Sequence, residues 1–241
     1  MAPTRTEDIG ATDGSGTFAG TVTLPAGGSG PGLMLLQEIF GVNDYIVDVA
    51  RRLAELGYVT LAPDLFWRQE PGVALGHDQA ALEKGMSLAQ RFDGAKGAED
   101  LGAALAHLRS LPEVRGGAGA IGFCFGGVMA YLTAAVADPD VAVAYYGSGV
   151  PDLLAMADQV ACPILFHFGT ADAFLPSERA EEVRAVFESR PDAEVRVHEG
   201  AGHAFDNSFA PQFSQPEHAE VAWGQTVAFL RRYLPVPQPV R

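Results

Sequence analysis

The chain is poor in lysine, and it contains no long hydrophobic run. Its two lysines, Lys84 and Lys96, belong to a set of 16 basic residues against 30 acidic ones, which gives a formal net charge of −14. Such a surface repels phosphate, so we expect neither nucleic acid nor a membrane as a partner. No run of about 18 apolar residues is present, and acidic residues stand near the N-terminus where a signal peptide would be apolar. The sequence therefore predicts a cytoplasmic protein.

Cysteine is also scarce, because the chain holds only Cys124 and Cys162 and neither belongs to a CxxC pair. A disulfide framework is therefore excluded, and we expect reduced thiols. The metal motif HExxH and the phosphate motif GxxxxGK[ST] are missing, so no metal site is expected. The segment Gly116–Gly119 is rich in glycine, but it precedes an apolar strand rather than following one, and we interpret it as a turn.

Short apolar runs alternate with stretches of helical period, a pattern typical of an α/β fold with a mostly parallel sheet and helices on both faces. The continuously apolar segment Gly32–Leu36 predicts a strand buried on both faces, whereas the alternating segment Thr17–Leu24 predicts an edge or antiparallel strand. We expect one domain over residues 1–241, in which residues 64–94, the excursion segment, pass over the sheet edge. Further strands are expected at 58–62, 118–123, 141–146, 163–168 and 193–198, and helices after 43, around 101–108, after 124, from about 177 and over 219–233.

The most specific motif is Gly122-Phe123-Cys124-Phe125-Gly126-Gly127, between an apolar strand and a helix. Small residues two positions to either side permit a turn sharp enough to lift residue 124 above the sheet, as in a nucleophile elbow with cysteine in the serine position. The first N–H groups of the helix favour a negative charge there. A lone cysteine is usually a small buried residue, which is our interpretation of Cys162, but the flanking glycines favour a nucleophile at Cys124.

A nucleophilic thiol needs a base, and the base needs a residue that orients it. In sheets with this elbow the acid and then the histidine follow the nucleophile along the chain. Asp172 follows one predicted strand and His203 follows the next, so both are expected at the sheet edge that carries Cys124. Asp172 could instead be a turn residue. The other histidines fit less well: His107 in a helix, His167 in an apolar strand, His198 before the glycine loop, and His77 and His218 at loop or solvent positions.

Glu38 is out of place at the end of a buried strand. A buried carboxylate is costly unless it is paired or its pKa rises, so Glu38 is either a functional group or a surface residue at a loop tip. The loop after this strand is where such a fold takes its second oxyanion donor. Glu38 would then lie beside the thiol, and the N–H groups of Ile39 and Phe125 would bind the oxyanion.

These motifs resemble those of the dienelactone hydrolases (carboxymethylenebutenolidases) of the α/β-hydrolase superfamily, from about Thr17 to Leu234. The resemblance implies a triad of Cys124, His203 and Asp172. It also implies that Glu38 helps to generate the thiolate once substrate displaces it, and that no cofactor is required. The family hydrolyses dienelactone in the catabolism of chlorinated aromatics. The resemblance rests on Gln37-Glu38-Ile39-Phe40-Gly41, Pro63-Asp64-Leu65, the cysteine elbow, Tyr145-Tyr146-Gly147 and Gly202-His203-Ala204-Phe205.

One departure from the family concerns the substrate. Members that act on dienelactone hold its carboxylate with two arginines, one in the excursion segment and one just after the histidine. Here Asp206 replaces the second, and we expect it to repel an anion beside the pocket. The excursion segment offers only Lys84, with Arg68 and Arg91 at its margins.

The sequence thus predicts a carboxylic ester hydrolase that uses a cysteine nucleophile on a lactone or activated ester. Two alternatives stay open: an esterase or thioesterase for uncharged substrates, and a non-catalytic or redox-sensing protein on the same fold. The expected partner is a small ester or lactone, and the expected assembly is a monomer or a small homo-oligomer.

Overall fold

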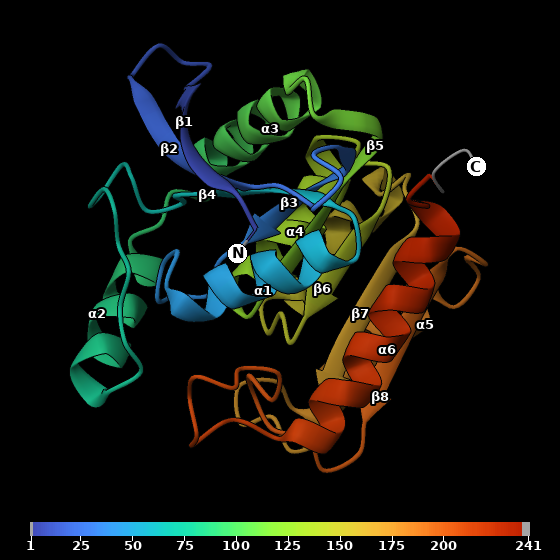
Figure 1. The fold of residues 1–241 in the computed structure, drawn as a ribbon. Coiled ribbons are helices and arrows are strands. Elements are labelled where there is room, and N and C mark those ends of the chain that lie inside the picture. Colours follow the sequence, from blue (N-terminus) through green and yellow to red (C-terminus); the bar gives the residue numbers. More distant parts are fainter. Residues whose placement is uncertain (1, 238–241) are drawn as a thin grey trace.

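The computed structural model describes residues 2–237, which form an eight-stranded sheet with helices packed on it (Figure 1). The strand order is β1-β2-β4-β3-β5-β6-β7-β8. The strands are β1 (Thr4–Gly10), β2 (Thr17–Thr23), β3 (Gly30–Leu36), β4 (Val59–Pro63), β5 (Val114–Phe123), β6 (Ala142–Tyr145), β7 (Ile164–Gly169) and β8 (Ala193–His198). The helices are α1 (Asp44–Glu55), α2 (Gln79–Gln90), α3 (Gly94–Ser110), α4 (Phe125–Val136), α5 (Ser177–Phe187), α6 (Pro216–Tyr233) and the 3-10 helix η1 (Val150–Gln159).

From β4 to β8 every neighbouring pair of strands is parallel. Their carboxyl ends therefore lie at one edge, and the segments that follow β3, β5, β7 and β8 all begin there. The predicted α/β architecture with a mostly parallel sheet is confirmed. Among residues 2–237, no helix combines the length and the apolar character needed to cross a lipid bilayer.

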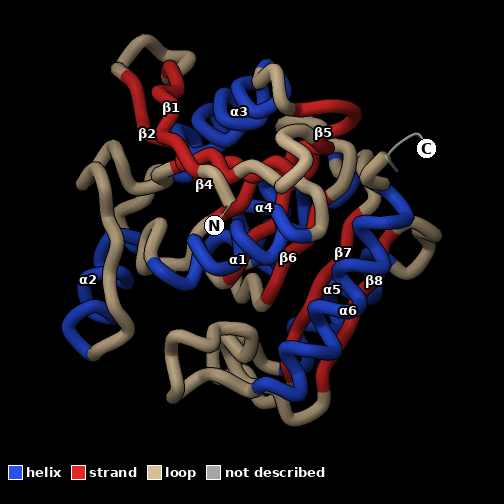
Figure 2. The backbone as a smooth tube through the Cα atoms, viewed as in Figure 1, coloured by secondary structure: helices blue, strands red, loops and turns tan. Residues whose placement is uncertain are grey.

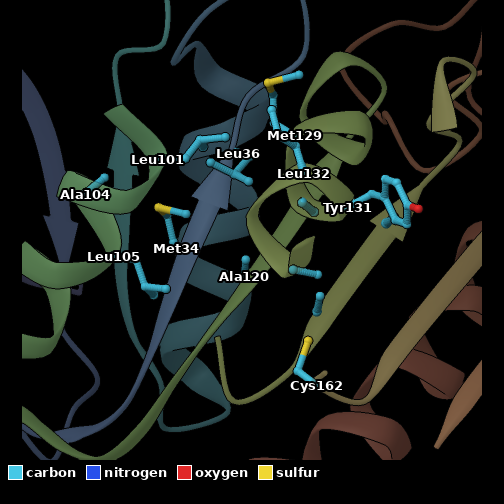
Figure 3. Packing of buried hydrophobic residues seen from close by; sticks show 14 of the residues in the cluster. Met34, Leu36, Leu101, Ala104, Leu105, Ala120, Met129, Tyr131, Leu132 and Cys162 are labelled. Atoms are coloured by element: carbon cyan, nitrogen blue, oxygen red, sulfur yellow. The ribbon is translucent and has the colours of Figure 1, made fainter. Parts of the chain in front are cut away.

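The two faces of the sheet carry separate hydrophobic clusters because side chains alternate along each strand. Met34 and Leu36 of β3 pack with residues of α3, α4 and α5, and Figure 3 shows them facing Leu101 and Leu105. Leu33 and Leu35 pack on the opposite face with residues of α1 and α6. All seven residues of β3 are buried, as its uninterrupted apolar run predicts.

Several elements differ from the sequence prediction. The strand β1 was missed because its sequence is largely polar. For β2 the antiparallel alternative is confirmed, because it pairs antiparallel with both β1 and β4, and it is not an edge strand. The prediction of a turn at Gly116–Gly119 is wrong, since these residues belong to β5, whose pairing with β3 shifts register between Gly30 and Gly32. An irregular register of this kind tolerates glycine inside a strand.

The excursion segment contains a helix, α2, that was not predicted because the glycines and the proline of the segment interrupt its helical pattern. Asp78 caps this helix by accepting the N–H of Ala81. Residue 85, inside this helix, is a glycine because a Cβ there would lie 2.6 Å from the carbonyl oxygen of Ile39. Figure 2 shows α2 beside the sheet, with long tan loops leading to it and to α6. This close approach places α2 against the loop that follows β3.

Candidate active site

Cys124 lies on a sharp turn between β5 and α4. Its backbone has φ 54° and ψ −115°, a left-handed conformation that costs a residue with a Cβ of order 1–3 kcal/mol. The turn is so tight that a Cβ on residue 122 would lie 1.8 Å from the carbonyl oxygen of Gly126. A Cβ on residue 126 would lie 2.1 Å from the carbonyl oxygen of Leu36. Glycine at both positions is therefore what allows the strained residue to project from the sheet.

His203 joins Cys124 to Asp172. Its Nε2 lies 3.0 Å from the Sγ of Cys124, and its Nδ1 lies 2.8 Å from Oδ2 of Asp172. The Asp172 side chain is fully buried, and its Oδ1 accepts the N–H of Phe174 at 2.8 Å. Since β5, β7 and β8 all end at one edge, the parallel sheet brings these three side chains together from distant parts of the chain.

The charges of this cluster favour a protonated imidazole. Burial acts to lower the pKa of His203, but the Cys124 sulfur and the hydrogen bond with Asp172 outweigh it and raise the pKa to about 10. A positively charged His203 and an ionised sulfur at Cys124 would therefore stabilise each other across 3.0 Å.

Glu38 is a buried carboxyl group, only 1% exposed, in the loop after β3. Its Oε2 accepts an N–H of Asn207 at 2.8 Å, whereas its buried Oε1 has no hydrogen-bond partner among the described residues. Burial raises the pKa of Glu38 to about 7, although His203 and the Asn207 donor act in the opposite direction. Glu38 is thus not a loop-tip surface residue, and it titrates near neutral pH.

A cavity of about 330 Å³ opens over these groups. Cys124, His203 and Glu38 all line it, together with Ile39 and Phe125. Phe125 opens α4, where the first N–H groups have no acceptor within the helix. The rest of the lining is largely apolar: Phe40, Leu82, Met86, Ala89, Val128, Met129, Ser148, Gly149, Phe174, Ala204 and Phe213.

Comparison with known proteins identifies the family of this chain. The model of the dienelactone hydrolase family matches residues 18–234. The chain belongs to the dienelactone hydrolase family. It is 37% identical to a carboxymethylenebutenolidase of Pseudomonas sp. (strain P51) over 224 residues, which covers 92% of this chain and 93% of the relative. It is 38% identical to a Pseudomonas putida carboxymethylenebutenolidase over 190 residues, with 78% and 80% covered.

The fold agrees with that of solved structures. A putative dienelactone hydrolase from Klebsiella pneumoniae superposes with a TM-score of 0.81 at 27% identity, covering 96% of this chain and all of the other. As a dienelactone hydrolase family member, the protein has the α/β-hydrolase fold and is a hydrolase of ester or lactone bonds.

Asp206 does not behave as the sequence suggested for a residue beside a dienelactone hydrolase pocket. Its fully buried carboxyl group accepts from the hydroxyl of Tyr45 at 2.9 Å and from Nη1 of Arg52 at 3.0 Å. Ala204, with φ 56°, turns the chain after His203. Asp206 therefore points toward α1, is absent from the cavity lining and is paired with Arg52, although its charge still helps to raise the pKa of Glu38 in that lining.

The cations of the excursion segment are also occupied elsewhere. Arg68 forms a bidentate ion pair with Asp100, and Lys84 pairs with Glu70. Arg91 borders a different surface cavity, beside Asp93. Within the described part of the chain, the lining of the cavity over Cys124 includes no lysine or arginine.

The remaining histidines and cysteine have other surroundings. As predicted, His167 is a hydrogen-bonded core residue, 3.0 Å from His198 and 3.0 Å from the hydroxyl of Thr226. Cys162 is buried, burial raises its pKa to about 12, and both cysteines are free thiols as expected.

Two polar residues of the site, Asn207 beside Glu38 and His77 beside Asn207, were not predicted to take part in it. Asn207 was not identified, because a loop asparagine usually indicates a turn. His77 lies in a loop, as predicted, but it is half-buried with its Nε2 3.1 Å from Nδ2 of Asn207. Asn207 follows His203 by four residues, and this position was the one sequence signal that could have indicated a role for it.

Proposed function

We propose that this protein hydrolyses a lactone or an activated ester through an acyl-enzyme formed on Cys124. The observation that carries the proposal is the hydrogen-bonded chain from the Cys124 sulfur through His203 to the buried Asp172, of which Cys124 and His203 line a mainly apolar cavity. Membership of the dienelactone hydrolase family supports the same reaction class.

In the proposed first half-reaction the Cys124 thiolate attacks the carbonyl carbon, and the N–H groups of Phe125 and Ile39 stabilise the oxyanion. The carbon–oxygen bond to the leaving alkoxide then breaks, and the His203 imidazolium gives that oxygen its proton. In a lactone the leaving oxygen stays attached to the acyl chain. The products of this step are a thioester on Cys124 and a neutral His203.

In the second half-reaction His203 accepts a proton from water, whose oxygen attacks the thioester. The carbon–sulfur bond breaks, the carboxylic acid product leaves, and the thiolate and imidazolium are restored. Asp172 holds the imidazole in one tautomer and stabilises its positive charge throughout.

We propose Glu38 as the group that takes the thiol proton. Once Glu38 has taken this proton, the negative charge of the Cys124 sulfur raises the pKa of His203, so the imidazole keeps its own proton for the leaving group. Glu38 lines the same cavity, presents a carboxyl oxygen without a partner, and has a pKa raised to about 7. Binding of substrate would displace Glu38 from its resting contacts and let it receive that proton.

The decisive experiment uses Cys124→Ala with Cys162→Ala as the matched control. The native enzyme and the control should hydrolyse p-nitrophenyl acetate and show a transient mass increase of one acetyl group at Cys124. Cys124→Ala should show neither. Hydrolysis by Cys124→Ala at the native rate would overturn the proposal, and absence of turnover by the native protein on every ester and lactone would favour a non-catalytic or redox-sensing role.

The apolar lining favours an uncharged substrate as a second candidate. An anion in this cavity would meet Glu38 and the thiolate, and the described lining offers the His203 imidazolium, already paired with that thiolate, but no arginine or lysine to balance the added charge. We expect kcat/KM for neutral p-nitrophenyl esters to exceed that for dienelactone. A strong preference for dienelactone would instead favour the substrate of aromatic catabolism. The reduced thiol that the mechanism needs is best maintained in the cytoplasm.

A further inference from the structure

Glu38 belongs to a polar network that reaches the surface through two residues outside the triad. We propose, on the basis of the role proposed for Glu38, that Asn207 and His77 are positioning residues: neutral His77 fixes the amide of Asn207, and Asn207 fixes the Glu38 carboxyl group over the nucleophile. Neither residue lines the cavity, so both act through Glu38.

The orientation of the Asn207 amide is set by the backbone. Its Oδ1 accepts the N–H of Phe209 at 3.0 Å, so the opposite atom of the amide must be the nitrogen. This Nδ2 lies 2.8 Å from Oε2 of Glu38 and 3.1 Å from Nε2 of His77. The side chain is fully buried, and each of its two N–H groups therefore has one partner.

Asn43 defines the protonation of His77 in the same way. Its Oδ1 caps α1 by accepting the N–H of Ile46 at 3.3 Å, so its Nδ2 faces the carbonyl oxygen of Leu75 at 3.0 Å and Nε2 of His77 at 3.4 Å. Two amide nitrogens thus face one ring nitrogen. Since an amide nitrogen only donates, Nε2 of His77 must carry the lone pair and its proton must be on Nδ1. A protonated His77 would place a donor against two donors.

His77 is itself held against the loop that contains Glu38. Its ring packs edge-on against Phe40 with centroids 4.6 Å apart, and its carbonyl oxygen accepts the side chain of Gln212 at 2.9 Å. The preceding residues pair with the Glu38 loop, where Val42 donates to Val73 and Leu75 donates to Phe40. The network therefore connects the excursion segment to Glu38 through hydrogen bonds of defined direction.

This arrangement holds Oε2 of Glu38 and leaves Oε1 as the atom available for a proton. Without the acceptor on His77, one N–H of the buried Asn207 loses its partner, and the amide moves to find another. The donor that favours ionised Glu38 is then weakened, so the carboxyl group ionises at higher pH. Other titratable groups near His77 are Asp44 on α1, which borders the same surface cleft, and Asp78, which caps α2.

The test compares His77→Leu, which removes the acceptor, with His77→Gln, whose amide oxygen restores one near Nε2. The readout is the pH dependence of kcat/KM for p-nitrophenyl acetate. We expect His77→Leu to shift the acid limb upward by about one unit, which lowers kcat/KM about tenfold near pH 6 and less than about twofold near pH 9. His77→Gln and the distant control His107→Leu should keep the native profile.

Asn207→Asp supplies a second test, because it retains an acceptor for the N–H of Phe209 but presents a carboxyl oxygen to Glu38. It should shift the acid limb further upward than His77→Leu. If His77→Leu and His77→Gln both keep the native acid limb, the positioning inference is wrong. Glu38→Gln distinguishes the role proposed for Glu38 from the positioning role of His77 and Asn207. If Glu38→Gln retains the acid limb, the role proposed for Glu38 is wrong. If Glu38→Gln loses the acid limb but His77→Leu keeps the native profile, only the positioning role is wrong.

Discussion

Nε2 of His203 lies 3.0 Å from the Sγ of Cys124, although 79 residues separate the two in the chain. The pair is held by the register of a parallel sheet, since Cys124 follows β5 and His203 follows β8. The distance is that of a direct hydrogen bond, so proton transfer between imidazole and the reacting groups needs no rearrangement of the backbone.

Replacement of the acid that orients His203 tests this geometry. In Asp172→Asn an amide can replace the carboxylate with little change of shape, but it favours the wrong imidazole tautomer and no longer stabilises the imidazolium. We expect kcat/KM for an activated ester to fall by about 10³–10⁴ with little change in the thermal midpoint. A loss smaller than about tenfold would contradict the proposed role of Asp172.

The raised pKa of Glu38 makes a prediction about stability. Below pH 4.5 the group is protonated in both the folded and unfolded chain, and above about pH 7 it is ionised in both. Between these values only the unfolded chain ionises, so Glu38 lowers the free energy of unfolding progressively as the pH rises. Glu38→Gln removes this effect. The difference in unfolding free energy between Glu38→Gln and the native protein should therefore increase, in favour of the variant, by about 3 kcal/mol from pH 4.5 to pH 8, as measured by urea unfolding. An equal difference at both pH values would contradict a raised pKa.

The glycines of the elbow are predicted to tolerate no Cβ. Gly122→Ala would place a Cβ 1.8 Å from the carbonyl oxygen of Gly126, so we expect a loss of about 1–3 kcal/mol or more in unfolding free energy together with loss of activity. Gly102→Ala is the matched control, because Gly102 lies within α3 and nothing lies within 4 Å of an added Cβ. It should stabilise the protein by about 0.5–1 kcal/mol. Equal effects of the two changes would show that the elbow is not constrained.

A cation introduced at the cavity should change substrate preference. Met86 lines the cavity from α2 and is 38% exposed, so a lysine there can keep its ammonium group hydrated. We expect Met86→Lys to raise the ratio of kcat/KM for dienelactone to that for a neutral ester by about fivefold, an attraction of about 1 kcal/mol. Val221→Lys, on the exposed side of α6, should leave the ratio unchanged. No change in either variant would indicate that charge at the cavity does not govern selectivity.

Much of the candidate site could be predicted because its signals are local. The glycines around Cys124 mark a turn that only small residues permit, and Asp172 and His203 follow recognisable strands. Once the strands are parallel, their carboxyl ends meet at one edge, and the order of these residues along the chain is enough to place them together.

The excursion segment could not be predicted in the same way. Gly85 weakens the helical pattern of α2. Glycine is needed at this position because the carbonyl oxygen of Ile39, from another part of the chain, lies too close for a Cβ. The polar strand β1 forms because β2 offers it an antiparallel partner. Close packing in α2 and hydrogen bonding to a neighbouring strand in β1 outweigh intrinsic preference.

The sequence by itself determined the parallel sheet, the elbow and the identity of its reactive side chains, since these follow from periodicity and from the steric freedom of glycine. Only the tertiary structure decided that Asp206 points toward Arg52, that the cavity over Cys124 is apolar, and that Asn207 contacts both Glu38 and His77. Burial, charge pairing and the direction of a hydrogen bond depend on which distant residues become neighbours, and that information is absent until the chain has folded.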